Sequence, residues 1–315
     1  MFSKPLPDFT IQETYPICVS FISDSEIKDY MNLMSEHVFL QSDKYLELVK
    51  KSKLQDLEIP NEFEITKDEN GKKLESCKNQ WFVKLYKYYF SRSDSRYERA
   101  NQFYNRIKLD GITTTSKYNK RCCYCNNHKI EVVDHFLPES KYNFLAVNPI
   151  NLVPSCEECN DNKHAYYPSA TNPVLVHPYF DFIDNISWLD VKIIDRVIGT
   201  DINNCKKYDY IFEYYIKNNL ACSVDINRIK KTFETLKIND NIVFDAQDFF
   251  NTELYYDLID SDELGDLSDQ ELSKLFLKKS INLNKQGYGL NHWKVVLYKM
   301  LSTLTDYSYL KENPL

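Results

Sequence analysis

The sequence predicts an α+β fold: a mainly helical chain with a central module of two strands and a helix, followed by a C-terminal region of mixed strands and helices. Three observations predict it. Residues 1–110 carry apolar side chains at helical spacing, two Cys-x-x-Cys pairs bracket the middle of the chain, and β-branched and aromatic runs follow. We expect three regions, 1–110, 111–180 and 181–315, because the residue pattern changes at these positions.

Size and composition are those of a folded protein. The chain has 315 residues, of which 43% are hydrophobic and 27% charged, and this excludes a disordered chain. No apolar run approaches the roughly 20 residues that cross a bilayer. The first residues, MFSKPLPDFTIQETYP, lack the basic and apolar segments of a secretion signal. We therefore expect a cytoplasmic protein with no membrane segment, and its oligomeric state stays open.

Region 1–110 is predicted to be helical. Apolar residues three to four positions apart predict helices at residues 25–40, 42–54, 79–90 and 95–109. Residues 84–121 contain ten Lys and Arg against three Asp and Glu, a net charge of +7, although the whole chain has a net charge of -7. A basic stretch of this kind favours contact with phosphates.

Region 181–315 is predicted to begin with strands and to end with helices. Runs at residues 187–199 and 208–224 are rich in β-branched and aromatic residues. Three capped helices should follow, because Asp225 precedes one apolar helical pattern, Ser268 and Glu271 form a capping-box spacing, and Asn291 can cap the last pattern. Residues 240–271 hold eleven carboxylates and no Lys or Arg, so this acidic stretch should face away from phosphate or towards a basic partner.

Four cysteines in region 111–180 have the spacing of a zinc site. Cys122 and Cys125 form one Cys-x-x-Cys pair, and Cys156 and Cys159 form the second. Four thiolates on two turns can surround Zn²⁺ as a closed tetrahedron, which leaves no position for a reacting water. We expect a structural zinc. The alternative is two pairs of buried thiols, and Cys123 is a spare cysteine that could replace one ligand.

The residues between the two pairs can carry hydrolytic chemistry. The residue pattern predicts a strand at residues 130–136, a second strand that returns beside it at 151–154, and a short helix at 157–165. The first strand ends with Asp134 and His135. Because neighbours on a strand point to opposite faces, both can serve one site only if the strand bends there, as Pro138 favours.

This segment resembles the HNH, or ββα-metal, nucleases. The shared signature runs in the order Asp134, His135, Asn151, Cys156, Cys159, Asn160 and Lys163 and covers roughly sixty residues of this region. The resemblance implies a ββα-metal module. Its third signature residue, often His in the family, is Asn160 here, which corresponds to the HNN variant. His164 can substitute as a ligand if the helix turns it inward.

The resemblance also implies a role for each residue. His135 would be the general base that takes a proton from the attacking water. Asp134 and Asn160 would hold one Mg²⁺ or Mn²⁺ through oxygen ligands. Asn151 would brace the loop that orients His135, and Lys163 would contact phosphate or balance developing charge.

These features together predict a metal-dependent HNH endonuclease that hydrolyses nucleic acid, with DNA favoured over RNA. Residues 84–121 would supply contacts to phosphate, and no motif for base readout is evident. One alternative is a non-catalytic zinc module that binds nucleic acid or a protein. Another is the nuclease subunit of a bacterial antiphage-defence complex, because a chain of this size with helical flanks resembles HNH effectors that work beside a separate ATPase. This chain has no phosphate-binding Gly-x-x-x-x-Gly-Lys loop, so any nucleotide dependence would come from that partner.

Overall fold

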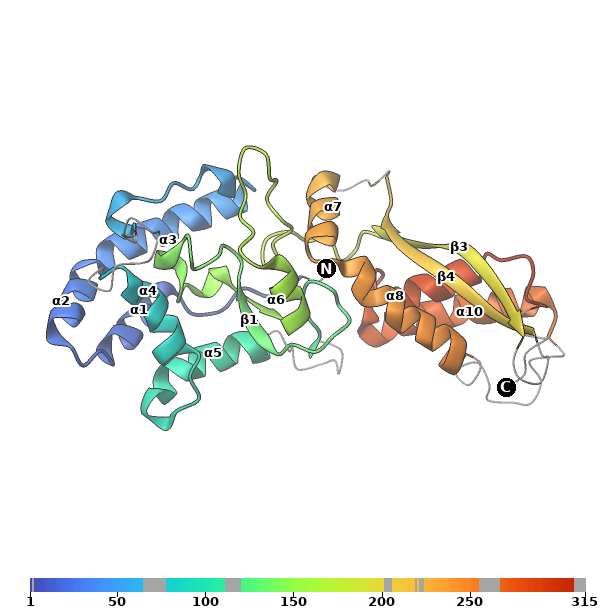
Figure 1. The fold of residues 1–315 in the computed structure, drawn as a ribbon, viewed down its shortest axis with the longest axis horizontal. Helices are drawn as coiled ribbons and strands as arrows, with labels where there is room; N and C mark the ends of the chain where they lie inside the picture. Colours follow the sequence, from blue (N-terminus) through green and yellow to red (C-terminus); the bar gives the residue numbers. More distant parts are fainter. Residues whose placement is uncertain are drawn as a thin grey trace. The chain divides into compact units, whose positions relative to one another are not determined.

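The computed structural model describes residues 1, 3–64, 78–110, 120–200, 206–218, 220, 224–254 and 267–308. Backbone contacts divide the chain into two compact units. The first unit consists of Phe2–Tyr124 and His128–Phe182, and the second of Ile183–Leu315 with Met1 and Cys125–Asn127. Helices predominate in both units and the sheets are small, so the mainly helical α+β fold is confirmed (Figure 1).

The first unit begins with a series of helices. They are α1 (Ile11–Ser20), α2 (Ser25–Leu33), α3 (Ser35–Lys50), α4 (Gln80–Leu85) with a π-helical continuation at Tyr86–Phe90, and α5 (Glu98–Asp110); short 3-10 turns lie at Leu54–Asp56, Asn61–Phe63 and Ser95–Tyr97. The predicted helix at 25–40 is in fact two helices that meet at Met34. The helix predicted at 42–54 is the second half of α3, and it stops early because Ser52 adopts a positive φ of 55°.

Helix α1 was not predicted from the sequence. It contains Pro16, which removes one backbone donor from the helix interior. A capping box between Thr10 and Glu13 stabilises its first turn, and its buried side chains, among them Tyr15, face the core. The Tyr15 hydroxyl donates to the Met31 carbonyl at 2.7 Å, which ties α1 to α2.

The strands and helix predicted in the centre of the chain are confirmed. Strand β1 (Val132–His135) pairs antiparallel with β2 (Leu152–Ser155), with His135 opposite Leu152, and α6 (Glu157–Lys163) follows. Two 3-10 turns, Asn143–Leu145 and Pro149–Asn151, lie in the connection between the strands. Together β1, β2 and α6 form a ββα arrangement within the first unit.

The second unit is built on a long hairpin of β3 (Leu189–Thr200) and β4 (Lys206–Ile216). Its helices are α7 (Ile226–Thr235), α8 (Ile238–Asp248), α10 (Asp269–Leu283) and α11 (Trp293–Leu301), with π-helical segments at Phe249–Glu253 and Asn284–Tyr288. Helix α8 packs against β4 (Figure 1). Helix α11 packs against both β3 and α10. The strand predicted at 208–224 ends at Ile216.

Two of the three predicted caps of this unit are confirmed. Asp225 caps α7, and Ser268 forms a capping box with Glu271 at the start of α10. The cap predicted for the last helix was wrong, because His292 accepts the N–H of Lys294 at 3.1 Å. Asn291 instead accepts the backbone N–H groups of Trp188 and Leu189, which fixes the start of β3.

Parts of two predicted charge clusters lie outside the described residues. These parts are residues 111–119 of the basic stretch and 255–266 of the acidic stretch. Among the helices that the structure does describe, none is long and apolar enough to traverse a bilayer.

Candidate functional site

The four predicted zinc ligands come together in the structure. They are Cys122, Cys125, Cys156 and Cys159, all buried, and their sulfur atoms lie within 4.8 Å of one another. None of the described cysteines forms a disulfide. Four converging thiols at this spacing fit the tetrahedral coordination of Zn²⁺, and Cys123 lies outside the cluster although it is equally buried.

Local backbone geometry explains why the two cysteine pairs face one ion. The first pair sits on a tight turn closed by a β-bridge between Arg121 and Lys129, where the Cys122 N–H donates to the His128 carbonyl at 2.8 Å. The second pair starts α6, because Cys156 is the N-cap and its Sγ accepts the Cys159 N–H at 3.4 Å. The cluster therefore ties the turn before β1 to the helix after β2.

A cavity of about 550 Å³ lies beside β1 and α6 in the first unit. Its lining includes Tyr86, Asp134, His135, Glu139, Asn160 and His164. The structure thus brings together both residues at the end of β1 and the two candidate ligands from α6 and its C-cap. Asn151 and Lys163 are not among the described lining residues and lie behind the cavity wall, almost fully buried.

His135 is oriented by a backbone carbonyl. Its Nε2 atom lies 2.8 Å from the carbonyl oxygen of Ala146, and because a carbonyl can only accept, Nε2 carries the proton. In the neutral imidazole the lone pair is then on Nδ1. Burial lowers the pKa of His135, partly opposed by the nearby Glu139 carboxylate and the Ala146 carbonyl, so the ring is neutral at pH 7.

Asp134 is held on both carboxylate oxygens. The Lys163 ammonium donates to Oδ1 at 2.9 Å, and the Tyr124 hydroxyl donates to Oδ2 at 2.8 Å. Lys163 also donates to the main-chain carbonyl of His135 at 2.8 Å. Burial raises the pKa of the Tyr124 phenol well above its ordinary value, so this group remains a donor. Each carboxylate oxygen has a second lone pair, so Asp134 can still accept a further ligand.

These contacts differ from the phosphate contact expected for Lys163. The side chain is 1% exposed, and its ammonium is directed at Asp134 and the end of β1. Lys163 therefore balances the buried charge of Asp134.

We expect the Lys163→Met variant to be less stable than the wild type by about 3 kcal/mol, because it leaves a buried carboxylate without its cation. Urea denaturation measures the change in free energy of unfolding. The combined Asp134→Asn and Lys163→Met variant loses both charges together and should be more stable than Lys163→Met alone. A double variant that is less stable than the single one would contradict the buried pair.

Asn151 makes the contacts that a bracing role requires. Its Oδ1 accepts the N–H of Leu137 at 2.8 Å, and its Nδ2 donates to the carbonyls of Leu137 at 3.1 Å and Leu145 at 3.4 Å. These bonds close the loop that leaves β1, which holds the Ala146 carbonyl near the ring of His135.

Three residues of this site were not predicted from the sequence: Tyr86 and Glu139, which line the cavity, and Tyr124, which contacts Asp134. The Tyr86 ring packs against the His135 ring at 4.4 Å between centroids, and its hydroxyl donates to the Val133 carbonyl at 3.0 Å. One carboxylate oxygen of Glu139 lies 3.7 Å from Nε2 of His135. For Tyr124, its position between two cysteines could have indicated a place at the site. Tyr86 belongs to an aromatic run at helical spacing, a pattern that is typical of a buried core.

The donor atoms at the cavity suit the cation implied by the resemblance. Asp134, Asn160 and His164 all line it, and carboxylate and amide oxygens are the ligands that Mg²⁺ and Mn²⁺ prefer. Within the described ranges, the only cluster of three or more His, Cys, Asp or Glu side chains is the four-cysteine one. A cation here would therefore depend on Asp134 and Asn160, with room for water or a substrate oxygen.

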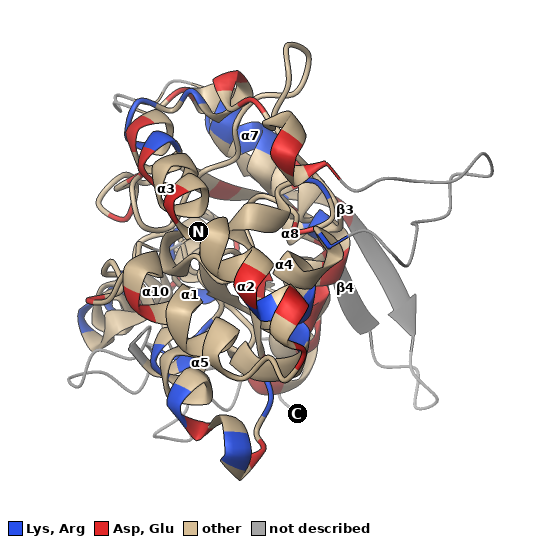
Figure 2. Ribbon diagram, turned by 90° about the vertical axis from the view of Figure 1, so that its left-hand side faces the viewer, with Lys and Arg blue, Asp and Glu red and all other residues tan. Residues whose placement is uncertain are grey.

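The basic stretch before this module is partly paired with acidic residues. Arg96 contacts Asp94 at 2.7 Å, Lys87 contacts Glu139 at 3.3 Å, and Arg106 pairs with Asp8. Figure 2 shows Lys and Arg on α5, with acidic residues at the turn before it. Exposed ion pairs of this kind contribute about 0–1 kcal/mol, so a phosphate can compete for the cations.

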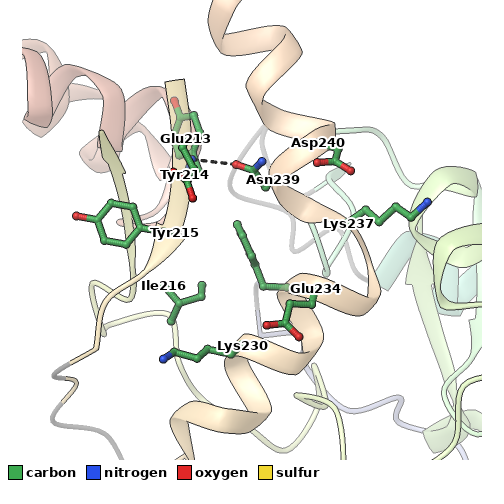
Figure 3. Close-up of a pocket in the computed structure, with 10 residues that line it drawn as sticks. Glu213, Tyr214, Tyr215, Ile216, Lys230, Glu234, Lys237, Asn239 and Asp240 are labelled. Carbon is green, nitrogen blue, oxygen red and sulfur yellow. Dashed lines mark hydrogen bonds between the residues drawn. The ribbon is translucent and has the colours of Figure 1, made fainter. Parts of the chain in front are cut away.

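A second cavity, of about 530 Å³, lies in the second unit between β4 and the helices α7 and α8 (Figure 3). The Oδ1 atom of Asn239 accepts a hydrogen bond from the Tyr214 N–H at 2.9 Å, in the upper part of the cavity in Figure 3. Its lining carries both signs of charge, with Lys230 next to Glu234. This mixture does not select a phosphate, and we assign no chemistry to it.

The chain is similar to two known proteins. It is 24% identical over 237 residues to protein ea31 of Escherichia phage lambda, a match that covers 71% of this chain and 73% of ea31. It is 38% identical over 72 residues to the Septu protein PtuB of Bacillus thuringiensis, and this match covers 21% of this chain and 27% of that protein. No family model and no solved structure matches the chain.

Proposed function

We propose that this protein is a metal-dependent endonuclease of the HNH type that hydrolyses phosphodiester bonds. The observation that carries the proposal is that Asp134, His135 and Asn160 line one cavity beside a ββα unit framed by four cysteines. The residue types, their order in the chain and their shared cavity all agree with hydrolysis of a phosphate ester.

His135 is proposed as the general base. Its Nε2 proton is engaged by the Ala146 carbonyl, so Nδ1 is the atom that can take a proton from water. Because burial lowers the pKa of His135, the ring is unprotonated and ready to accept that proton near pH 7. The Tyr86 ring limits the freedom of the imidazole and thus keeps Nδ1 in one orientation.

Asp134 and Asn160 are proposed to hold one Mg²⁺ or Mn²⁺. When bound, such a cation polarises the scissile phosphate and stabilises the leaving oxygen. Asp134 contributes a buried carboxylate whose position is fixed by Lys163 and Tyr124. The Asn160 amide comes from α6, one turn before the helix ends at Lys163.

DNA is the proposed substrate, with the cations of α5 and of the turn before it as contacts to the backbone phosphates. The test is to incubate the purified protein with supercoiled plasmid and with single-stranded RNA, each in Mg²⁺, Mn²⁺ or EDTA. We expect nicked or linear plasmid with either cation and intact plasmid with EDTA. The combined Asp134→Asn and Lys163→Met variant, prepared in parallel, controls for a contaminating nuclease and should leave plasmid intact. A wild type that cuts neither substrate in any buffer would refute a nuclease that acts without a partner.

Antiphage defence is the proposed setting of this activity. The partial match to the Septu protein PtuB supports it, as does the cysteine cluster that fits a zinc-framed nuclease. In this setting a partner ATPase would control the nuclease. A non-catalytic zinc module is the second candidate function, and it requires only the cysteine cluster, so the plasmid assay separates the two.

A further inference from the structure

The two cysteine pairs lie next to the two residues that hold Asp134. Tyr124 stands between Cys123 and Cys125 on the turn of the first pair and is fully buried. Lys163 is the last residue of α6, the helix that begins at the second pair. Each pair therefore fixes the backbone from which one donor to Asp134 extends.

The contacts of these two donors are complementary. The Tyr124 hydroxyl reaches Oδ2 of Asp134 at 2.8 Å, and the Lys163 ammonium reaches Oδ1 at 2.9 Å. Lys163 adds a bond of 2.8 Å to the His135 carbonyl, which fixes the last residue of β1 as well. Asp134 is 3% exposed, so loss of either donor leaves a largely buried carboxylate with one fewer hydrogen bond.

We propose that the zinc cluster positions the cation-binding carboxylate: one cysteine pair acts through Tyr124 and the other through Lys163. Tyr124 and Lys163 are then positioning residues that touch neither substrate nor water. The cation-binding role of Asp134 rests on the proposed function. The link between the cysteines and Asp134, through Tyr124 and Lys163, can be tested without nuclease activity.

The link has a reciprocal consequence. If zinc binding holds Tyr124 and Asp134 in place, then the bond between Tyr124 and Asp134 must in turn favour bound zinc. Removing a hydrogen bond to a buried charged group should therefore weaken zinc binding roughly tenfold. At an unchanged rate of zinc association, this loss of affinity gives faster release of zinc to a chelator. In the same variant, Mn²⁺ should bind more weakly at the cavity and its electron paramagnetic resonance spectrum should change.

The experiment compares Tyr124→Phe with Tyr15→Phe. Tyr15 is a matched control, because it is also buried and its hydroxyl donates at 2.7 Å, but to the Met31 carbonyl, far in the sequence from the four clustered cysteines. Zinc release is followed with a chelating dye, zinc content by mass spectrometry, and Mn²⁺ affinity by titration. We expect about tenfold faster zinc release for Tyr124→Phe and no change for Tyr15→Phe.

Combining Tyr124→Phe with Asp134→Asn completes the test, because two groups that act through one bond give effects that do not add. If Asp134→Asn alone fails to fold, the combined Asp134→Asn and Lys163→Met variant replaces it as the background. Equal zinc release from Tyr124→Phe and Tyr15→Phe, or fully additive effects in the double variant, would overturn the link. Coupled zinc release in a protein that cuts no nucleic acid would support the link and refute only a nuclease that acts without a partner.

Discussion

Replacing His135 by Ala is expected to slow plasmid cleavage roughly 10²–10⁴-fold, the usual contribution of a positioned general base. The loss should fall on kcat, because the ring acts on the attacking water and does not bind the substrate. Single-turnover cleavage under saturating Mg²⁺ measures it. Zinc content and Mn²⁺ affinity should remain near the wild-type values, since the His135 side chain contacts neither the cysteines nor the donors to Asp134.

His37→Ala is the matched control for this variant. His37 is 55% exposed on α3, and among the described residues its ion-pair partner is Glu62 at 3.3 Å, so its loss should leave cleavage unchanged. If His135→Ala and His37→Ala cleave at the same rate, His135 is not the base.

Replacing Cys156 by Ala is expected to abolish zinc binding and to unfold the ββα unit. Structural zinc sites contribute about 10–16 kcal/mol in small zinc-binding peptides, which matches or exceeds the ~5–15 kcal/mol net stability of a whole domain. The helices of the first unit have their own aromatic core, so we expect partial unfolding, seen as a lowered first transition in calorimetry. Zinc per chain, measured by mass spectrometry, should fall from about one to zero.

Cys123→Ala separates loss of zinc from loss of a buried sulfur. Cys123 is buried in the same turn but lies outside the cluster, so this variant should keep its zinc and most of its stability. A wild type that folds without zinc, or a Cys156→Ala variant as stable as Cys123→Ala, would contradict a structural four-cysteine site.

The ββα unit could be predicted from the sequence because its signals are local. The strand at 130–136, the return at 151–154 and the helix at 157–165 are each set by short-range pattern and by cysteine spacing. Helix boundaries in residues 1–110 were harder to predict. The break at Met34 lies within one continuous apolar pattern, so the sequence does not indicate it. Pro16 argues against a helix at α1. Packing in the tertiary structure determines both features.

The candidate site was predictable in its residue types but not in its contacts. The resemblance to the ββα-metal nucleases placed Asp134, His135 and Asn160 in one site, and the structure puts them on one cavity. The partner of Lys163 could not be predicted. Helix α6 has only 7 residues, and a shift of its start by one residue would point the Lys163 side chain in another direction. Tyr86 belongs to a helical segment far from β1 in the sequence, so its contact with the site cannot be predicted from local sequence.

We propose that two metal sites with different roles share one small module. Anomalous diffraction from crystals grown with Mn²⁺ tests it most directly, because zinc and manganese are distinguished by their absorption edges. We expect a zinc peak among Cys122, Cys125, Cys156 and Cys159 and a separate manganese peak in the cavity beside Asp134 and Asn160. A zinc peak with no manganese at Asp134, or manganese bound only at the cysteines, would contradict it.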